Sequence, residues 1–315
     1  MVAHGDNMGM REEILSLKDQ VLSRDSINFD PNKFKSVIVA GMGGSGIAGQ
    51  ILSDIYDRVP VIPLSGYNLP AFADSSSLVV AISYSGNTEE TISCFDQARE
   101  RGCPIAAITS GGILSRYSGT VIRIPGGLQP RSAIGYMIMP LLRGFMNLGD
   151  RDAAGIRNAI ASAFDREVEI KRLAEELANG NRTPVVIGTP EFRGVALRWR
   201  TQFNENSKVV AYSTFLPEAN HNDTAWMPSF DEDRFKLIAF KSMDPGINLR
   251  IDLTQKITGR KFHVIGSDGT LVERLFFLIA YGDLLSYHLG VLRGIDPLDV
   301  SVLSRLKEGL AASKR

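Results

Sequence analysis

A buried-strand signal that runs directly into a glycine-rich loop and a helix, at residues 37–48, constrains this sequence most. Glycines let the backbone turn sharply and approach an anion closely. The first amides of the following helix lack partners inside the helix and, with its dipole, favour negative charge. No Gly-Lys-Ser/Thr follows, and Ser45 interrupts the spacing of a dinucleotide fingerprint. We therefore predict that this loop binds a phosphate.

A second cluster with the same order of strand, hydroxyl-rich loop and helix start lies at residues 79–90. Ser83, Ser85 and Thr88 can all donate hydrogen bonds to oxygens of one phosphate. The alternative is that these residues merely cap a helix. Because both clusters follow predicted parallel strands, and ligands bind at the carboxyl ends of such strands, the phosphate-binding interpretation is favoured.

The strand signals predict an α/β fold of two tandem doubly wound parallel-sheet domains, which are flavodoxin-like or Rossmann-like three-layer sandwiches. The predicted strands are continuous apolar runs, which is typical of burial on both faces. A polar break near residue 150 divides a first domain, 11–150, from a second, 151–315, which opens with one long helix at 152–181. The predicted strands are 36–40, 59–62, 78–82, 105–109, 121–124, 184–188, 209–213, 235–240 and 261–265. Predicted helices include one at 47–57, after the first loop, and one at 296–312, at the C-terminus.

Composition excludes several classes of function. Lys+Arg and Asp+Glu balance at 35 each, so no broad basic face is indicated and nucleic-acid binding is not expected. We find no apolar run of the ~18 residues needed to cross a bilayer and no signal peptide, and we expect a cytoplasmic protein without a membrane partner. Residues 1–10 are expected to form a disordered extension, with Met8 and Met10 as alternative starts. Cys94 and Cys103 are expected to be reduced, and no zinc spacing is present.

Three further positions are candidates for chemistry. Arg131 lies in a turn-rich loop between a strand and a helix, where a guanidinium can face an oxyanion, although an ordinary paired surface arginine is the alternative. Glu205 lies near the end of the predicted helix 192–206, where negative charge opposes the helix dipole and suits a general base. His221 is the best acid/base candidate of four histidines, but it could instead cap a helix, and Glu218 could serve as the base.

The sequence resembles the two-domain sugar isomerases, specifically the bifunctional phosphoglucose/phosphomannose isomerases of archaea and some bacteria. The resemblance spans nearly the whole chain after the N-terminal extension. The first two loops mark any sugar isomerase domain and are shared with non-enzymatic sugar-phosphate sensors. The Asn-Glu-Asn motif around Glu205 and the Pro-Glu-Ala-x-His-Asn motif that ends at Asn222 are more specific to the isomerases.

The resemblance implies a metal-free and cofactor-free aldose-ketose isomerisation of a sugar phosphate through a cis-enediol. Glu205 would move the proton between C1 and C2, and Arg131 would stabilise the enediolate oxygen. His221 would assist ring opening from the other subunit of a homodimer, and Lys307 would approach the substrate. The residues implied in phosphate binding are Gly44, Ser45, Ser83, Ser85 and Thr88.

One position departs from the family pattern. The family associates a threonine in the C-terminal segment with the mannose epimer, and Val300 stands at the equivalent position here, with Ser301 adjacent. A valine cannot hold a water through a hydroxyl. We therefore expect either that Ser301 substitutes or that mannose activity is weakened. The rival hypothesis for the whole chain is a sugar-phosphate-binding regulator that has lost the chemistry.

Overall fold

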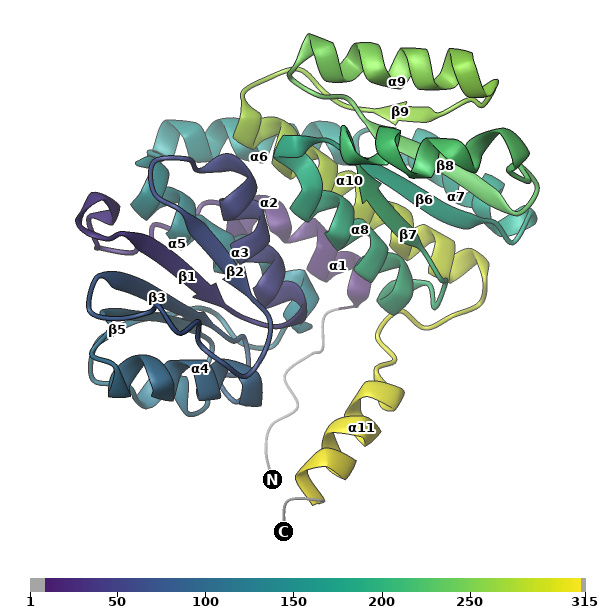
Figure 1. Cartoon of the computed structure of the whole chain (residues 1–315). Helices are drawn as coiled ribbons and strands as arrows, with labels where there is room; N and C mark the ends of the chain where they lie inside the picture. The colour runs from purple at the N-terminus through teal and green to yellow at the C-terminus, as the bar shows by residue number, and fades with distance from the viewer. Residues whose placement is uncertain (1–8, 313–315) are drawn as a thin grey trace.

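The computed structural model describes residues 9–312 and contains two parallel sheets, each flanked by helices (Figure 1). The strands of the first sheet are β1 (Ser36–Ala40), β2 (Val61–Leu64), β3 (Ser77–Ile82), β4 (Ile105–Thr109) and β5 (Thr120–Arg123). They follow the order β2-β1-β3-β4-β5. All neighbours pair in parallel, and Ala40 lies opposite Ala81. The carboxyl ends of β1 and β3 are therefore adjacent.

The second sheet repeats this arrangement with one strand fewer. Its strands are β6 (Thr183–Gly188), β7 (Tyr212–Phe215), β8 (Phe235–Phe240) and β9 (His263–Ile265), in the order β7-β6-β8-β9. Every pair is again parallel. The prediction of two tandem doubly wound parallel sheets is confirmed. Strand β7 begins three residues later than the sequence pattern suggested, because the amide of Val209 still bonds back to the carbonyl of Phe203 near the end of α8, at 3.2 Å.

Helices cover the sheets and fill the space between them (Figure 1). The α-helices are α1 (Met10–Leu15), α2 (Leu17–Gln20), α3 (Gly43–Ile55), α4 (Glu89–Glu100), α5 (Ile134–Met146), α6 (Asp150–Phe164), α7 (Glu167–Asn179), α8 (Arg193–Asn206), α9 (Pro245–Thr258), α10 (Leu271–Leu292) and α11 (Ser301–Ala312). Short 3₁₀ turns are η1 (Pro31–Lys33), η2 (Leu114–Arg116), η3 (Pro130–Ala133), η4 (Pro190–Phe192), η5 (Glu218–His221), η6 (Asp223–Ala225) and η7 (Met227–Ser229).

The structure corrects three predicted helices. The single helix expected at 152–181 is two helices, α6 and α7, because the chain bends after Phe164 so that both can pack along α10. Helix α3 begins four residues earlier than expected, at Gly43, which places Ser45 in its first turn. The C-terminal helix begins at Ser301 and not at Asp296. Pro297 is buried in a non-helical segment.

The N-terminal prediction is also partly wrong. Met10 is 3% exposed and begins α1, so the expected extension ends before it. Residues 1–8, with Met8 as an alternative start, lie outside the described part of the chain. Cys94 and Cys103 are both free and buried.

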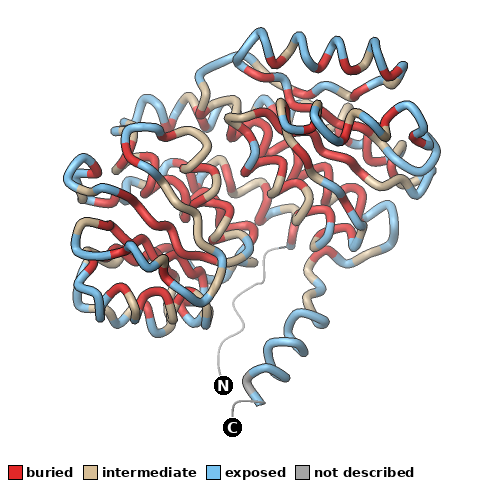
Figure 2. Tube along the Cα trace, viewed as in Figure 1, coloured by how far each residue is buried: buried red, intermediate tan, exposed pale blue. Residues whose placement is uncertain are grey.

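The core is shared between the two halves (Figure 2). One cluster of buried side chains includes Val37 of the first sheet, Val186 of the second and Trp199 between them. Helix α10 is long and apolar enough to cross a membrane, but 83% of its apolar window is buried in the protein. Our expectation that no such segment exists missed this helix, whose burial identifies it as a core helix.

Helix α11 is the exception to this packing. It projects from the body of the molecule (Figures 1 and 2), and residues 301–310 are all exposed. Four of its apolar side chains are among the exposed ones, namely Val302, Leu303, Leu306 and Leu310.

Candidate functional site

The site begins where the strand order of the first sheet reverses, between β1 and β3. In open parallel sheets this switch point leaves a crevice at the carboxyl ends of the strands, where ligands bind. Both loops predicted to hold phosphate start there. They touch, because a Cβ on Gly41 would lie 3.0 Å from the carbonyl oxygen of Ile82. The Ser65 hydroxyl donates to the Gly41 carbonyl at 3.0 Å and fixes the first loop from the other side.

The first loop leads into α3. Gly43 has a φ of +52°, a conformation that glycine adopts without strain. Gly44 then packs against the next part of the site, since a Cβ there would lie 3.2 Å from the Cα of Arg131. Ser45 is buried in the first turn of the helix and donates its hydroxyl to the sulfur of Met137 at 3.3 Å. The helix N-terminus predicted to face an anion therefore lies beside the arginine predicted to act with it.

The second loop is organised by Ser83, which is fully buried. Its Oγ accepts hydrogen bonds from the backbone amides of Gly86 at 3.1 Å and Thr88 at 3.4 Å, and it lies 2.8 Å from the Thr88 hydroxyl. Ser85 is exposed, and its Oγ accepts from the amide of Asn87 at 3.3 Å. Ser85 and the half-buried Thr88 are thus the more accessible hydroxyls, while Ser83 shapes the loop.

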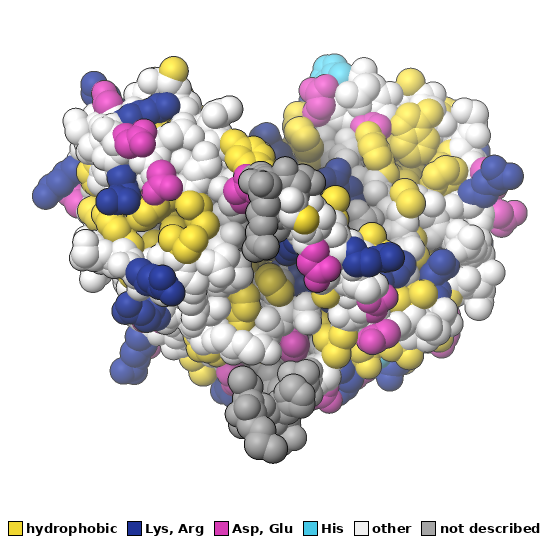
Figure 3. Space-filling model, turned by 90° about the horizontal axis from the view of Figure 1, so that it is seen from below, with side chains coloured by type: hydrophobic (Ala, Val, Ile, Leu, Met, Phe, Trp, Pro, Cys, Tyr) yellow, Lys and Arg dark blue, Asp and Glu magenta, His cyan; other side chains and the backbone are white. Residues whose placement is uncertain are grey.

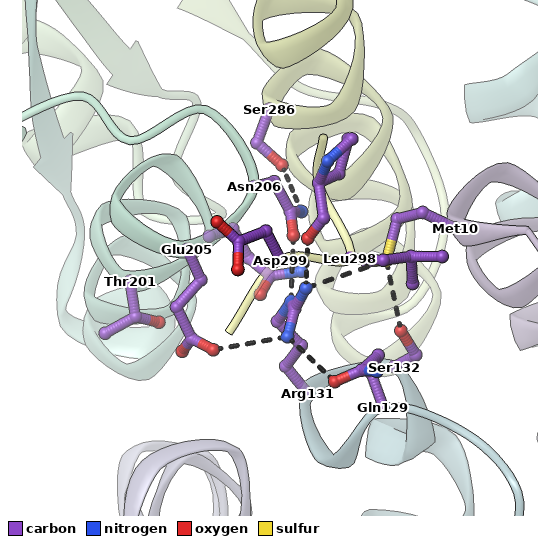
Figure 4. Close-up of polar contacts among 12 residues, drawn as sticks. Met10, Gln129, Arg131, Ser132, Thr201, Glu205, Asn206, Ser286, Leu298 and Asp299 are labelled. Atoms are coloured by element: carbon purple, nitrogen blue, oxygen red, sulfur yellow. Dashed lines mark hydrogen bonds and ion pairs between the residues drawn. The ribbon is translucent and has the colours of Figure 1, made fainter. Parts of the chain in front are cut away.

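Arg131 is at the centre of the site and is only 3% exposed (Figure 4). Its Nε donates to Oδ1 of Asn206 at 2.8 Å, and its Nη2 donates to the carbonyl oxygen of Pro297 at 2.6 Å. Its Nη1 lies 3.3 Å from Oε1 of Gln129 and 3.4 Å from Oε2 of Glu205. The guanidinium is therefore held in place from three parts of the chain that are far apart in the sequence.

Glu205 lies on the last turn of α8, and Figure 4 shows its carboxylate pointing toward Arg131. Its side chain is 30% exposed against 3% for that of Arg131. The carboxylate thus stands at the border between the buried guanidinium and solvent. The helix end can approach α10 closely because Gly290 faces it, where a Cβ would lie 2.5 Å from the carbonyl oxygen of Asn206.

A buried polar network behind the site holds Arg131, and sequence reasoning missed it. Arg198 is 1% exposed and binds both carboxylate oxygens of Asp283, at 3.0 and 2.6 Å. Its Nη2 also donates to the backbone carbonyl of Arg131 at 2.9 Å. Asn206 is anchored in turn by donating to the Ser286 hydroxyl at 2.9 Å. The signal in the sequence was that Asp283 and Ser286 are isolated polar residues within the otherwise apolar α10. Their partners on α8 could not be identified before the packing of the two helices was known.

The N-terminal helices fix the same loop from the opposite side. Gln20 is fully buried; it donates to the carbonyl of Ser132 at 2.9 Å and accepts from the amide of Gly135 at 3.1 Å. Glu13 accepts from the amide of Gln129 at 3.0 Å. Helices α1 and α2 thus help to support the loop of Arg131.

The single chain does not bring all predicted residues together. His221 is exposed at the end of η5, and among the described contacts none links it to Arg131 or Glu205. Lys307 is exposed on the projecting α11. Hydrogen bonds of the residues that follow His221 hold its loop in place. Asn222 donates to Glu218 at 3.2 Å, and the buried Asp223 accepts from hydroxyls and an indole of its own domain.

The face from which α11 projects is notched between the two lobes (Figure 3). Within the described residues, no group of three or more His, Cys, Asp or Glu side chains is placed to hold a metal ion. The chemistry that the described site offers is hydrogen-bond donors for an anion, one buried guanidinium and one partly exposed carboxylate.

Two family models and several known proteins match this chain. Residues 32–139 match the SIS domain, and residues 166–310 match the bacterial phospho-glucose isomerase C-terminal SIS domain. The chain is 47% identical over 310 residues to the bifunctional phosphoglucose/phosphomannose isomerase of Thermoplasma volcanium, covering 96% of this chain and 100% of that one. Its identity to the enzyme of the same name from Thermoplasma acidophilum is 44% over 308 residues, covering 96% and 98%.

A solved structure supports the fold alone. The C-terminal domain of glucosamine-fructose-6-phosphate aminotransferase from Francisella tularensis superposes with a TM-score of 0.75 at 18% identity. The match covers 91% of this chain and 97% of that one.

Proposed function

This chain belongs to the bifunctional phosphoglucose/phosphomannose isomerase family, and from this premise we propose that its site interconverts fructose 6-phosphate with glucose 6-phosphate and with mannose 6-phosphate. The observation that carries the proposal is the pairing of Arg131 with Glu205 at 3.4 Å, beside two loops suited to phosphate. The activity serves carbohydrate metabolism, at a step shared by glycolysis and gluconeogenesis, in the cytoplasm.

The phosphate would lie at the switch point between β1 and β3. The first turn of α3 supplies backbone amides near Gly44, and Ser45, Ser85 and Thr88 supply hydroxyls. Ser45 can exchange its contact with the Met137 sulfur for a phosphate oxygen, which is a far better acceptor. Ser83 keeps the second loop in shape and presents the Thr88 hydroxyl. Neutral donors hold the dianion here, so no lysine is required.

The reaction moves one proton between neighbouring carbons. Starting from open-chain fructose 6-phosphate, Glu205 removes a proton from C1, and the electron pair flows through the C1–C2 bond to the C2 oxygen. Arg131 stabilises the negative charge that develops on this oxygen. Glu205 then returns the proton to C2, while the hydroxyl proton of O1 passes to O2, so that the C1 carbonyl forms and O2 becomes a hydroxyl. Delivery to opposite faces of C2 gives the glucose and mannose epimers.

Two features support a homodimer in which His221 serves the partner's site. The histidine is exposed and has no described contact with Arg131 or Glu205 of its own chain. In addition, α11 exposes four apolar side chains that a single chain leaves uncovered. A second copy related by two-fold symmetry could bring His221 to the sugar ring for ring opening. The same assembly could bring Lys307 from the projecting helix to the substrate.

The domain division follows the same proposal. We place the phosphate-binding domain at residues 11–150 and the domain carrying Glu205 and His221 at 151–315.

The non-catalytic sensor is not favoured. A sensor needs the phosphate loops but has no use for a carboxylate and a guanidinium held against each other by a buried network.

A coupled assay of the purified chain tests the proposal. Fructose 6-phosphate should give glucose 6-phosphate in the presence of a chelator, and Glu205→Gln should abolish turnover while Glu218→Gln retains it. No turnover of any of the three sugar phosphates by the wild-type chain would contradict the proposed function. Retained turnover in Glu205→Gln would instead move the role of base to Glu218.

A further inference from the structure

The end of the helix that carries Glu205 is closed by a residue in an unusual backbone conformation. Of the described non-glycine residues, three have a positive φ, namely Asn147, Asn181 and Lys208. Asparagine tolerates this region, but lysine at a φ of 54° is under strain that glycine would relieve. If this position were required only for the turn at the helix end, glycine would allow the same backbone conformation with less strain. The lysine side chain must therefore contribute something that offsets the strain.

The contacts of Lys208 show what the side chain does. Its Nζ donates to the backbone carbonyl of Glu205 at 2.5 Å and to the backbone carbonyl of Asp299 at 2.7 Å. The ammonium thus joins the last turn of α8 to the segment that precedes α11. Lys208 is an exposed residue, but partial desolvation of its ammonium lowers its pKa, and the charge of Arg131 lowers it further.

The segment that Lys208 holds is the same one that contacts Arg131. Pro297, two residues before Asp299, accepts the hydrogen bond from Nη2 of Arg131 at 2.6 Å. The segment has little other regular structure, since its internal bonds are local ones from Leu298 to Asp296 and from Ser301 to Asp299. Fixing Asp299 on α8 therefore also fixes the carbonyl that orients the guanidinium (Figure 4).

We propose that Lys208 is a positioning residue for the isomerisation. It fastens the segment of Pro297 and Asp299 to the end of α8 and thereby holds Arg131 where it can stabilise the enediolate beside Glu205. The inference rests on the proposed function. It predicts that Lys208 acts on kcat rather than on substrate binding, because the phosphate loops that hold the substrate lie on the other domain and do not contact it.

The test compares three variants with a matched control. Lys208→Gly removes the ammonium and relieves the strain, Lys208→Met removes the ammonium and keeps the strain, and Lys208→Arg keeps a charged donor. The control is Asn147→Gly, which makes the same backbone change at a positive φ of 56° at the exposed end of α5. Each is assayed for kcat and KM with fructose 6-phosphate, for melting temperature, and for hydrogen exchange of the amides of residues 298–301.

We expect Lys208→Gly and Lys208→Met each to lower kcat at least tenfold with KM within threefold of wild type. Exchange at residues 298–301 should rise at least tenfold, and the melting temperature of Lys208→Gly should be no lower than wild type. The logarithm of kcat for Lys208→Arg should lie at least halfway between the value for Lys208→Met and the value for wild type. Asn147→Gly should keep wild-type kcat and exchange.

Several results would overturn the proposal. One is a kcat within twofold of wild type in Lys208→Gly, and another is a loss of kcat in Lys208→Gly that is absent in Lys208→Met. The proposal would also be overturned if Lys208→Arg recovered none of the lost kcat, or if the loss of kcat accompanied a lowered melting temperature. Failure of the proposed function is distinguishable, because it appears as an inactive wild-type chain. In that case the exchange measurement still decides whether Lys208 holds the segment.

Discussion

Nη1 of Arg131 lies 3.4 Å from Oε2 of Glu205, although 74 positions separate the two residues and they flank different sheets. The pairing brings a buried positive charge to a carboxylate that solvent can still reach. Such a pair is suited to a reaction in which a proton leaves carbon and negative charge develops on the neighbouring oxygen. It depends on the packing of the two halves against each other.

The two kinds of hydroxyl in the second loop should respond differently to mutation. Removing the Thr88 hydroxyl, in Thr88→Val, should raise KM for fructose 6-phosphate about tenfold, which corresponds to one hydrogen bond to a charged group. Ser83→Ala should lower the melting temperature more, because it leaves the Thr88 amide without its buried acceptor and removes one of the two acceptors of the Gly86 amide. Steady-state kinetics and the melting temperature check this. A lower melting temperature in Thr88→Val than in Ser83→Ala would contradict it.

Mixing inactive subunits tests the shared site. Glu205→Gln and His221→Ala homodimers should each have lost activity. If one chain supplies Glu205 and its partner supplies His221, a 1:1 mixture should regain about a quarter of wild-type activity, because half of the dimers are mixed and each has one intact site. Activity is measured after the subunits have been unfolded and refolded together. A mixture that stays inactive, although mass spectrometry finds mixed dimers, would argue against the arrangement.

Asp54 should make stability depend on pH. It lies on α3, accepts from the amide of Gly194 at the start of α8 at 2.6 Å, and from Gln50 at 3.0 Å. Burial raises its pKa from 3.8 to about 6. The folded protein therefore binds this proton more tightly than the unfolded chain does. The resulting contribution to stability is present below about pH 4 and is lost as the pH rises to about 6.

Asp54→Asn should remove this dependence. The amide keeps an acceptor for Gly194 but cannot ionise, so the free energy of unfolding at pH 7.5 should rise by about 3 kcal/mol and stay unchanged near pH 4. Denaturant unfolding at the two pH values measures it, with Asp57→Asn on the exposed neighbouring residue as the control. An equal effect of Asp54→Asn at both pH values would show that ionisation of Asp54 is not the cause.

Val300 should influence the choice between epimers. It is half-buried between Asp299 and the start of α11, next to the segment that contacts Arg131. Val300→Thr adds a hydroxyl of nearly the same volume, which can hold a water near C2. The ratio of mannose to glucose 6-phosphate turnover should rise severalfold, as measured in parallel coupled assays. An unchanged ratio would remove Val300 from the account and leave Ser301 to be tested in the same way.

The positions of the two loops after β1 and β3 could be predicted from the sequence because the geometry of such loops is local. A strand, a glycine turn and a helix start determine where the residues from Gly41 to Ser45 lie, whatever the rest of the chain does. The parallel direction of the strands follows from the same pattern, since buried strands that alternate with helices are joined by helical crossovers. These features need only neighbouring residues.

The rest of the site could not be read in this way, because it depends on distant segments that meet in space. Pro297 fits the first turn of a helix by local rules, yet it lies in a non-helical segment because its carbonyl binds Arg131. Asn206 and Arg198 look like ordinary polar residues of α8 until α10 supplies Ser286 and Asp283. Lys208 appears in no motif, and its proposed positioning role can be inferred only from its backbone angle and its two carbonyl partners.

The most direct test of the central claim is isomerisation of fructose 6-phosphate in deuterium oxide, with NMR detection of deuterium at C2 of the glucose 6-phosphate formed. If Glu205 relays the proton, part of the wild-type product should carry deuterium at C2, because the protonated carboxylate of this partly exposed residue exchanges with solvent in some turnovers before it returns the proton. Glu205→Gln should neither turn over nor exchange the C1 protons. Wild-type product without deuterium at C2, or continued exchange in Glu205→Gln, would contradict the account.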